Sequence, residues 1–261
     1  MNKEEYFQKI EKKLKNLGVK KNSVLIVCAD LLKLLILFRK DKINFSPDEL
    51  INLFIRVIGK SGTLIFYSFN WNFFKGKIFD YKNSKSFSGT LSNYALKRKD
   101  FKRSKNPVYS FLVYGKYKNK ICNMKHDNCF SLNSPFGFLL KKNAKCILID
   151  LDYKNSSYPF FHVAEQKANV YYRFYKNFSG KVIEKGFLKN IKIKMFVREK
   201  GYKITTIYSK KTDNILKKLN ALNLEKFKNI RISFLNVKKL YEITVKQFKI
   251  ENQMILRKKS D

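Results

Sequence analysis

The stretch SPDELINLFIRVIGKSGTLIFY, residues 46–67, decides the fold. It opens with a serine that can cap a helix, a proline that suits the first helical position, and a glutamate that completes a capping box. The pattern predicts a helix that ends at Gly59, followed by a buried strand over 63–67. A helix that leads straight into an apolar strand is the repeating unit of a sheet covered by helices on both faces.

The same alternation extends over the rest of the chain. Other helices are expected at 3–17, 91–97, 212–222 and 236–246, and other buried strands at 22–28, 109–114 and 145–151. From about Val182 onward, short strands are expected to alternate with helices. The prediction is an α/β fold, a three-layer α/β/α arrangement with a mixed central sheet, plus a smaller C-terminal α+β portion.

A chain of 261 residues can bury one large core. Because no internal repeat or low-complexity linker marks a boundary, we predict a single domain over residues 1–261. Its core spans roughly residues 15–180, and residues 181–261 are a C-terminal extension of the same domain.

Charge is the most unusual property of the composition. The chain has 56 Lys and Arg against 20 Asp and Glu, a net charge of +36. Such an excess suits nucleic acid, membrane surfaces or phosphorylated small molecules. The lysines are spread over the whole chain, however, and Lys, Asn, Ile, Phe and Tyr are all over-used, as in proteins from AT-rich genomes. No RNA-recognition or helix-turn-helix pattern is present, so we expect no dedicated nucleic-acid partner.

The four cysteines form no CxxC pair, and no disulfide framework is expected. Cys122, His126 and Cys129 could supply three metal ligands, but their spacing is unusual and no fourth ligand is evident, so no metal is predicted. No signal peptide is evident. The longest apolar stretch, residues 24–38, contains two charged residues and is too short to span a bilayer. We therefore expect a cytoplasmic protein without a transmembrane segment.

The stretch YPFFHVAEQ, residues 158–166, contains one of only two histidines. In a helix, His162 and Glu165 share a face, so the carboxylate can orient the imidazole and stabilise its charged form. On spacing alone, a buried structural pair is as good an interpretation as a catalytic one.

Two further polar loops adjoin predicted strands, RSKNPVYS at 103–110 and SPFGFL at 134–139. Loops at strand ends usually build the ligand crevice of an open α/β sheet. The ordered set RS-x-x-P-x-x-S, SP-x-G-x-L and H-x-x-E resembles the aminoglycoside 3-N-acetyltransferase family.

The likeness to that family covers roughly residues 15–180. LGVKKNSVLIV at 17–27 and GTLIF at 62–66 look like the family's first two strands, and Phe79-Asp80 looks like a later loop. VYYRFYKNFSG at 170–180 is similar to the branch found among surface-polysaccharide biosynthesis proteins.

Two departures from the family pattern stand out. Where the family typically has His-Ser-Ser near coenzyme A, this chain has Cys28-Ala29-Asp30, and the usual His of the Arg-Ser motif is Asn106. A catalytically weak relative, retained for assembly with glycan enzymes, is therefore one alternative.

The resemblance implies acyl transfer from acetyl-coenzyme A to an amine in a ternary complex. A protonated amine is not a nucleophile, so a base must accept a proton as the nitrogen attacks the thioester. His162 is the predicted base and Glu165 its orienting carboxylate. The residues predicted to bind the cofactor, through its phosphates, its pantetheine arm or the developing oxyanion, are Arg103, Ser104, Ser110, Ser134 and Gly137.

The predicted acceptor is an amino sugar, carried on a nucleotide or another phosphorylated carrier, because a polycationic antibiotic suits an acidic pocket and this chain is basic. Asp80, Tyr172 and Arg173 are predicted to contact it. The alternatives are an aminoglycoside acceptor, giving antibiotic resistance, and a basic RNA- or polyanion-binding protein in which His162 is structural. The sequence leaves open the acylated position, the acyl chain length, nitrogen versus oxygen acylation, and whether the chain forms a homodimer.

Overall fold

The computed structural model describes residues 2–126, 128–156, 158–199, 203–204, 210–250 and 256–257. Its centre is a sheet of seven strands in the order β10-β11-β6-β1-β2-β5-β4. The three middle strands run parallel, and the outer strands are antiparallel to their neighbours, so the sheet is mixed as predicted. The strands are β1 (Val24–Ala29), β2 (Thr63–Phe69), β4 (Lys102–Arg103), β5 (Tyr109–Gly115), β6 (Lys145–Ile149), β10 (Leu222–Phe227) and β11 (Ile230–Asn236).

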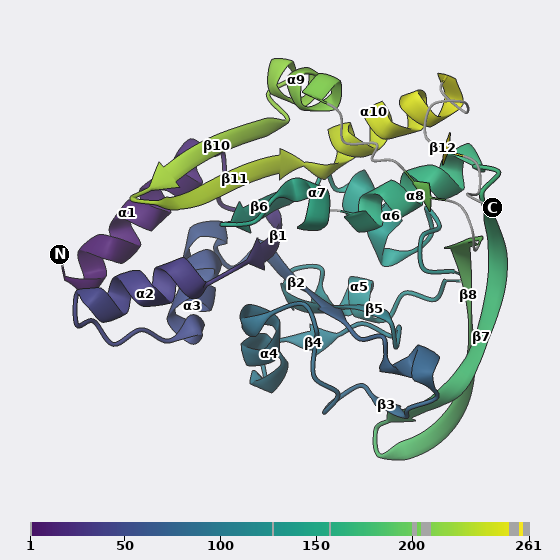
Figure 1. Cartoon of the computed structure of the whole chain (residues 1–261). Helices are drawn as coiled ribbons and strands as arrows, with labels where there is room; N and C mark the ends of the chain where they lie inside the picture. The colour runs from purple at the N-terminus through teal and green to yellow at the C-terminus, as the bar shows by residue number, and fades with distance from the viewer. Residues whose placement is uncertain are drawn as a thin grey trace.

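This sheet separates two groups of helices (Figure 1). In β1, Leu25 packs in the core on one side of the sheet, while its neighbour Ile26 packs in the core on the other. The first core is covered by α1 (Lys3–Asn16), α2 (Leu32–Lys40), α3 (Pro47–Ile58) and α4 (Thr90–Lys97). The second is covered by α5 (Lys118–Cys122), α6 (Pro135–Lys141), α7 (Tyr153–Ser156), α8 (Tyr158–Ala168), α9 (Lys210–Lys218) and α10 (Val237–Ile250). The three-layer α/β prediction is confirmed.

The elements with strong local signals form where the sequence predicts them. Ser46 accepts the backbone N–H of Asp48, Glu49 completes the capping box, and α3 ends at Gly59. The predicted strands at 63–67, 109–114 and 145–151 correspond to β2, β5 and β6. The predicted helix at 91–97 is α4.

A second sheet, in the order β3-β7-β8, was not predicted. It consists of β3 (Phe79–Asp80), β7 (Arg173–Glu184) and β8 (Phe187–Arg198), and the last two form a long hairpin. The prediction of only short strands after Val182 was therefore wrong. Much of the hairpin is polar and partly exposed, so it lacks the apolar run that identifies a buried strand.

The C-terminal part of the chain returns to the main sheet. β11 pairs antiparallel with β6, and β10 extends the sheet beyond it. The short strands β9 (Lys203–Ile204) and β12 (Leu256–Arg257) pair with each other. Among the described residues, no helix is both long and apolar enough to cross a membrane.

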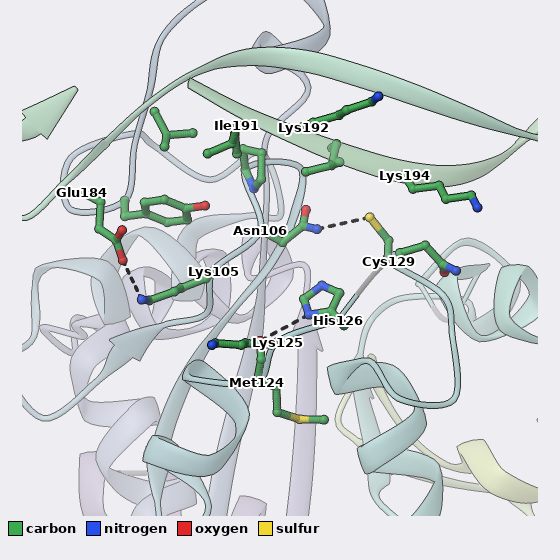
Figure 2. A pocket seen from close by; sticks show the side chains of 15 residues that line it. Lys105, Asn106, Met124, Lys125, His126, Cys129, Glu184, Ile191, Lys192 and Lys194 are labelled. Carbon is green, nitrogen blue, oxygen red and sulfur yellow. Dashed lines mark hydrogen bonds and ion pairs between the residues drawn. The ribbon is translucent and has the colours of Figure 1, made fainter. Parts of the chain in front are cut away.

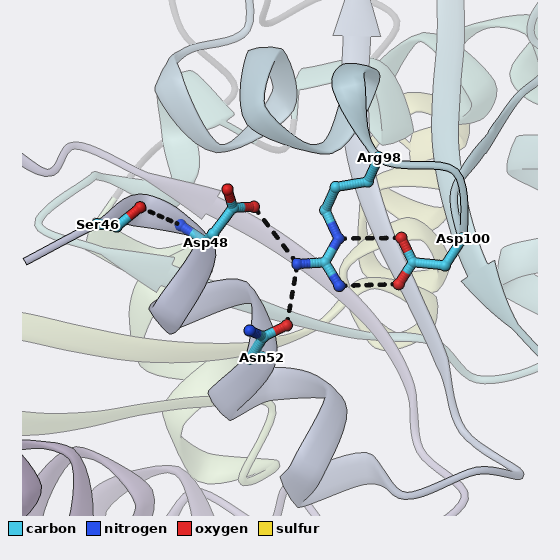
Figure 3. A network of polar contacts seen from close by, with 5 residues as sticks. All are labelled: Ser46, Asp48, Asn52, Arg98 and Asp100. Carbon is cyan, nitrogen blue, oxygen red and sulfur yellow. Dashed lines mark hydrogen bonds and ion pairs between the residues drawn. The ribbon is translucent and has the colours of Figure 1, made fainter.

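Arg98, at the end of α4, clamps two helices and a loop together (Figure 3). Its Nε and Nη2 donate to the carboxylate of Asp100 at 3.0 and 2.8 Å, while Nη1 donates to Asn52 of α3 at 2.9 Å. Nη1 also lies 3.4 Å from Asp48 in the first turn of α3. The clamp fixes how α3 and α4 pack over the same face of the sheet.

We expect Arg98→Ala to lower the free energy of unfolding by about 1 kcal/mol, the upper end for a partly exposed ion-pair network. The neighbouring Lys99→Ala is the matched control and should stay within about 0.5 kcal/mol, as usual for surface positions. Urea denaturation measures both values. Equal losses in the two variants would contradict the clamp.

Candidate active site

The centre of the site is the pair of His162 and Glu165 on α8. Helical spacing brings His162 Nδ1 to 2.7 Å from Glu165 Oε2, as the sequence predicts. The Glu165 side chain is 2% exposed, whereas the imidazole keeps 22% of its surface accessible and lies edge-on to the ring of Phe130. The carboxylate is therefore buried, while the imidazole can be reached from outside.

Two residues at the start of the hairpin complete the surroundings of Glu165. The Tyr172 hydroxyl donates to Oε1 at 2.8 Å, and Arg173 Nε lies 2.9 Å from Oε2, an ion-pair distance without hydrogen-bond alignment. Burial raises the pKa of Glu165, but the contacts with His162, Arg173 and Tyr172 outweigh it and hold that pKa below its ordinary value. The carboxylate is thus ionised in spite of its burial.

His162 Nδ1 also lies 3.0 Å from Arg173 Nη2. A guanidinium can only donate, so Nδ1 either donates to Glu165 or accepts from Arg173. Burial lowers the pKa of His162, Glu165 raises it, and the positive charges of Arg173 and Arg198 lower it again, with a net decrease. A lowered pKa keeps the imidazole neutral near neutral pH, which is the form that can accept a proton.

The sequence predicts acceptor contacts for Tyr172 and Arg173. The structure places both side chains against Glu165, and their contact with an acceptor stays a prediction. Arg173 is further held by the carbonyl of Phe196, to which Nη1 donates at 3.0 Å. A Tyr-Arg pair seven and eight residues after the glutamate is the signal that the sequence contained. The contact of this pair with Glu165 depends on the turn of the chain from α8 into β7, which the sequence does not show.

The residues predicted to bind the cofactor are engaged in internal contacts. Arg103 is buried over the ring of Phe79, and it donates to Ser110 Oγ at 3.0 Å and to the Ser68 carbonyl at 2.9 Å. It also donates to the carbonyl of Ser84. Burial lowers the pKa of Arg103 to about 10. Ser110 in turn donates to the Ser68 carbonyl. The assignment of Arg103 and Ser110 to the cofactor stays a prediction.

The remaining predicted residues also have local roles. Ser104 Oγ accepts the N–H of Phe111 at 2.8 Å, and Asp80 accepts backbone N–H groups of its own turn. At Gly137 a Cβ would stand 2.0 Å from the Leu132 carbonyl oxygen, so only glycine lets α6 pack against that loop. Ser134, just before α6, is fully buried, and its hydroxyl has no hydrogen-bond partner among the described residues.

The cysteines make ordinary contacts. Cys122 Sγ donates to the Lys102 carbonyl, and Cys129 Sγ accepts from the amide of Asn106, both at 3.2 Å. Within the described ranges, no three His, Cys, Asp or Glu side chains gather in a group that could hold a metal ion.

A cavity of about 310 Å³ lies under the hairpin, beside the Arg-Ser motif. Figure 2 shows the hairpin strands passing over Lys105, Lys125 and His126. Among the described lining residues Glu184 is the single acid, and its ion pairs with Lys105 at 2.7 Å and Lys189 at 2.8 Å lower its pKa to about 2. The lining, which also includes Lys192 and Lys194, is therefore cationic overall.

A second cavity, of about 420 Å³, lies at the carboxyl ends of β1 and β2, where ligands of open α/β sheets usually bind. Cys28, Ala29 and Asp30 line it, together with the rings of Trp71 and Phe87, which stack at 5.8 Å with an interplanar angle of 10°. The segment Cys28-Ala29-Asp30, where the chain departs from the family pattern, therefore lies in the wall of this second cavity.

His162 belongs to the described lining of neither cavity, but a chain of aromatic contacts connects it to the walls of both. Its ring meets that of Phe130, which directly follows Cys129 in the wall of the first cavity. Phe130 in turn contacts Tyr109, and Tyr109 contacts Phe69 in the wall of the second cavity, each with 5.0 Å between ring centres.

Comparison with known sequences finds a family model that covers most of the chain. The family model described as aminoglycoside 3-N-acetyltransferase matches residues 39–249. A curated relative, the SPbeta prophage-derived aminoglycoside N(3')-acetyltransferase-like protein YokD of Bacillus subtilis (strain 168), is 40% identical over 70 residues. That match covers 26% of this chain and 25% of the relative.

Similar solved structures span almost the whole chain. The crystal structure of YokD from Bacillus subtilis has a TM-score of 0.71 at 19% identity and covers 94% of this chain and 99% of its own. AAC-IIIb in a binary complex with CoASH has a TM-score of 0.76 at 15% identity, covering 94% and 96%. AAC-VIa bound to sisomicin has a TM-score of 0.76 at 11% identity, covering 94% and 97%.

We expect Arg173→Gln to raise the pKa of His162, because the substitution removes a positive charge 3.0 Å from Nδ1 and leaves Glu165 in place. An NMR titration of the imidazole resonances measures it, and His126, the chain's only other histidine, is the internal reference. An unchanged or lowered pKa for His162 would show that Arg173 does not act on the imidazole.

Proposed function

The chain belongs to the aminoglycoside 3-N-acetyltransferase family, a family of coenzyme A-dependent N-acetyltransferases, and we propose that it acetylates the amine of an amino sugar with His162 as general base. The observation that carries the proposal is the partly accessible imidazole held at 2.7 Å by a buried, ionised carboxylate. We further propose that the reaction serves surface-glycan biosynthesis in the cytoplasm.

Glu165 supports the base in two ways. When Nδ1 donates to Oε2, the lone pair of the imidazole is on Nε2, where it can accept the proton of the attacking amine. As the imidazole gains that proton, the carboxylate stabilises the imidazolium. Arg173 works in the opposite direction, because its charge disfavours the imidazolium and so favours release of the proton.

The cationic cavity under the hairpin suits the phosphates of the acetyl donor. Acetyl-coenzyme A, when bound, supplies an acetyl thioester and carries several negative charges on its phosphates. Lys105 and Lys125 are the side chains that would offset those charges, next to Asn106 of the Arg-Ser motif. Unlike Arg103, whose Nη atoms donate to backbone carbonyls, these lysines line the cavity itself.

The second cavity suits the acceptor. Asp30 contributes a carboxylate that can attract an amine, and the stacked rings of Trp71 and Phe87 offer a flat apolar wall to a sugar. A net charge of +36 repels a polycation but tolerates an amino sugar whose carrier is anionic. The charge of the chain therefore favours a nucleotide- or phosphate-linked amino sugar over an aminoglycoside.

We expect His162→Gln to lower kcat by about a hundred- to ten-thousandfold, the usual contribution of a general base. Steady-state acetylation assays measure this loss. Binding of coenzyme A, measured by calorimetry, should survive the substitution and serves as the control for folding. Undiminished turnover in the variant would exclude His162 as the base.

The pH dependence of the wild-type enzyme checks the same assignment. The neutral imidazole is the active form, and its pKa lies below the ordinary value of 6.5 because burial and two arginines outweigh Glu165. The acid limb of kcat/KM should therefore fall below pH 6.5. An acid limb that stays above that value after correction for ionisation of the acceptor amine would contradict a base whose pKa Arg173 helps to lower.

We expect a nucleotide-linked amino sugar to be acetylated with a kcat/KM at least about tenfold above that of sisomicin, since each 1.4 kcal/mol of differential binding gives tenfold. The assay compares both acceptors with the same enzyme and donor. A higher kcat/KM for sisomicin would contradict the proposed nucleotide-linked acceptor, and it would not affect the assignment of His162 as the base.

A further inference from the structure

Helix α2 has an outer face that is apolar although it is exposed. Its inner face is buried through Leu34 and Phe38, yet Leu32, Leu35 and Ile36 on the outside are 62%, 39% and 57% accessible. A surface helix normally turns polar residues outward. Single exposed leucines are common, but three neighbours on one helical stripe indicate a surface that another molecule covers.

The same stripe continues as a basic one. Positions 32, 35, 36, 39 and 40 follow helical spacing, so Arg39 and Lys40 extend the line that Leu32 and Ile36 begin. Both basic side chains are exposed. The outer face of α2 therefore combines an apolar half with a cationic half.

A hollow of about 460 Å³ opens beside this stripe. It is lined by Lys33, Ile36, Leu37, Lys40, Asp41, Lys228 and Asn229. Its single acid, Asp41, accepts from the Tyr6 hydroxyl and lies 3.7 Å from Lys228. Of the three lysines, Lys33 pairs with Asp150 at 2.9 Å and Lys228 with Asp41, and Lys40 adds a third positive charge. The surroundings of the hollow therefore stay net cationic and suit an anionic group next to Ile36.

From this geometry we propose that α2 and the adjoining lysine hollow form a docking surface for a membrane that contains anionic phospholipid. Phosphate head groups fit the hollow, and the upper parts of the acyl chains fit Leu32, Leu35 and Ile36. A second copy is a poorer occupant, since it would bring the basic end of α2 toward another chain of charge +36. Nucleic acid matches the lysines but offers nothing to three aliphatic side chains.

The surface lies away from His162 but adjoins the second cavity, because Leu32 directly follows Asp30 and Leu31 in that cavity's wall. In Figure 1, α2 is on the opposite side of the molecule from α8 and the β7–β8 hairpin. A docked enzyme therefore keeps His162 and the cavity under the hairpin open. The proposal stands apart from acetyl transfer, and its failure would not affect the assignment of the base.

Flotation of the full chain with vesicles tests the proposal. Binding is expected to vesicles of phosphatidylcholine mixed with phosphatidylglycerol, to be weak with phosphatidylcholine alone, and to fall as salt rises. The double variant Leu32→Ser with Ile36→Ser should lose about tenfold or more in apparent affinity, since it removes two aliphatic anchors. Lys40→Gln should lose about fivefold, the effect of one cation near an anionic surface.

Matched control variants distinguish binding through the α2 surface from a general effect of exposed lysines and apolar side chains. Leu224 on β10 is 54% exposed, and Lys218 on α9 is exposed as well. Leu224→Ser and Lys218→Gln should bind vesicles like the wild type, and all variants should keep the wild-type circular dichroism spectrum. Equal binding by the α2 double variant, or equal losses in the controls, would overturn the proposal. So would a dimer in sedimentation analysis that the α2 substitutions dissociate without any effect on vesicle binding.

Discussion

The buried carboxylate of Glu165 is the constraint on which the arrangement of the site depends. A carboxylate with 2% of its surface exposed is unfavourable unless charged and hydrogen-bonded partners surround it. Here the partners come from two elements, His162 on α8 and Tyr172 and Arg173 at the start of the hairpin. Removing one partner would leave the charge partly uncompensated, so helix and hairpin must stay together for the site to exist.

This constraint also positions the cationic cavity. β7 begins at Arg173, beside the base, and runs to Glu184, where Lys105 and Lys189 hold its carboxylate. The same strand therefore contacts the proposed base and its carboxylate at one end and, at the other, Lys105, one of the two lysines proposed for the donor phosphates. A hairpin anchored at both ends can fix the distance between the reacting group and the anion site.

The sequence predicted those features whose causes are local. The capping box at Ser46 and the apolar strands depend on neighbouring residues, and the order of three short motifs located His162 and Glu165. Contacts between residues that are far apart in the sequence were not predicted. The bonds of Arg103 end on the carbonyls of Ser68 and Ser84, and the role of Arg173 requires that β7 begin next to α8. No spacing rule in the sequence encodes such contacts.

The departure at Cys28-Ala29-Asp30 is consistent with a division of charge between the two cavities. Asp30 Oδ1 accepts the N–H of Leu32 at 2.9 Å, so one oxygen helps to begin α2 while the carboxylate still lines the cavity at the end of β1. A strongly basic protein that must bind an amine needs a local negative charge, and it needs that charge away from the lysines that attract phosphate. Asp30 lies in the cavity that has no lysine among its described lining residues. On this view the aspartate does not disturb a donor site; it makes the other cavity acceptable to an amine, and acceptor selectivity should depend on it.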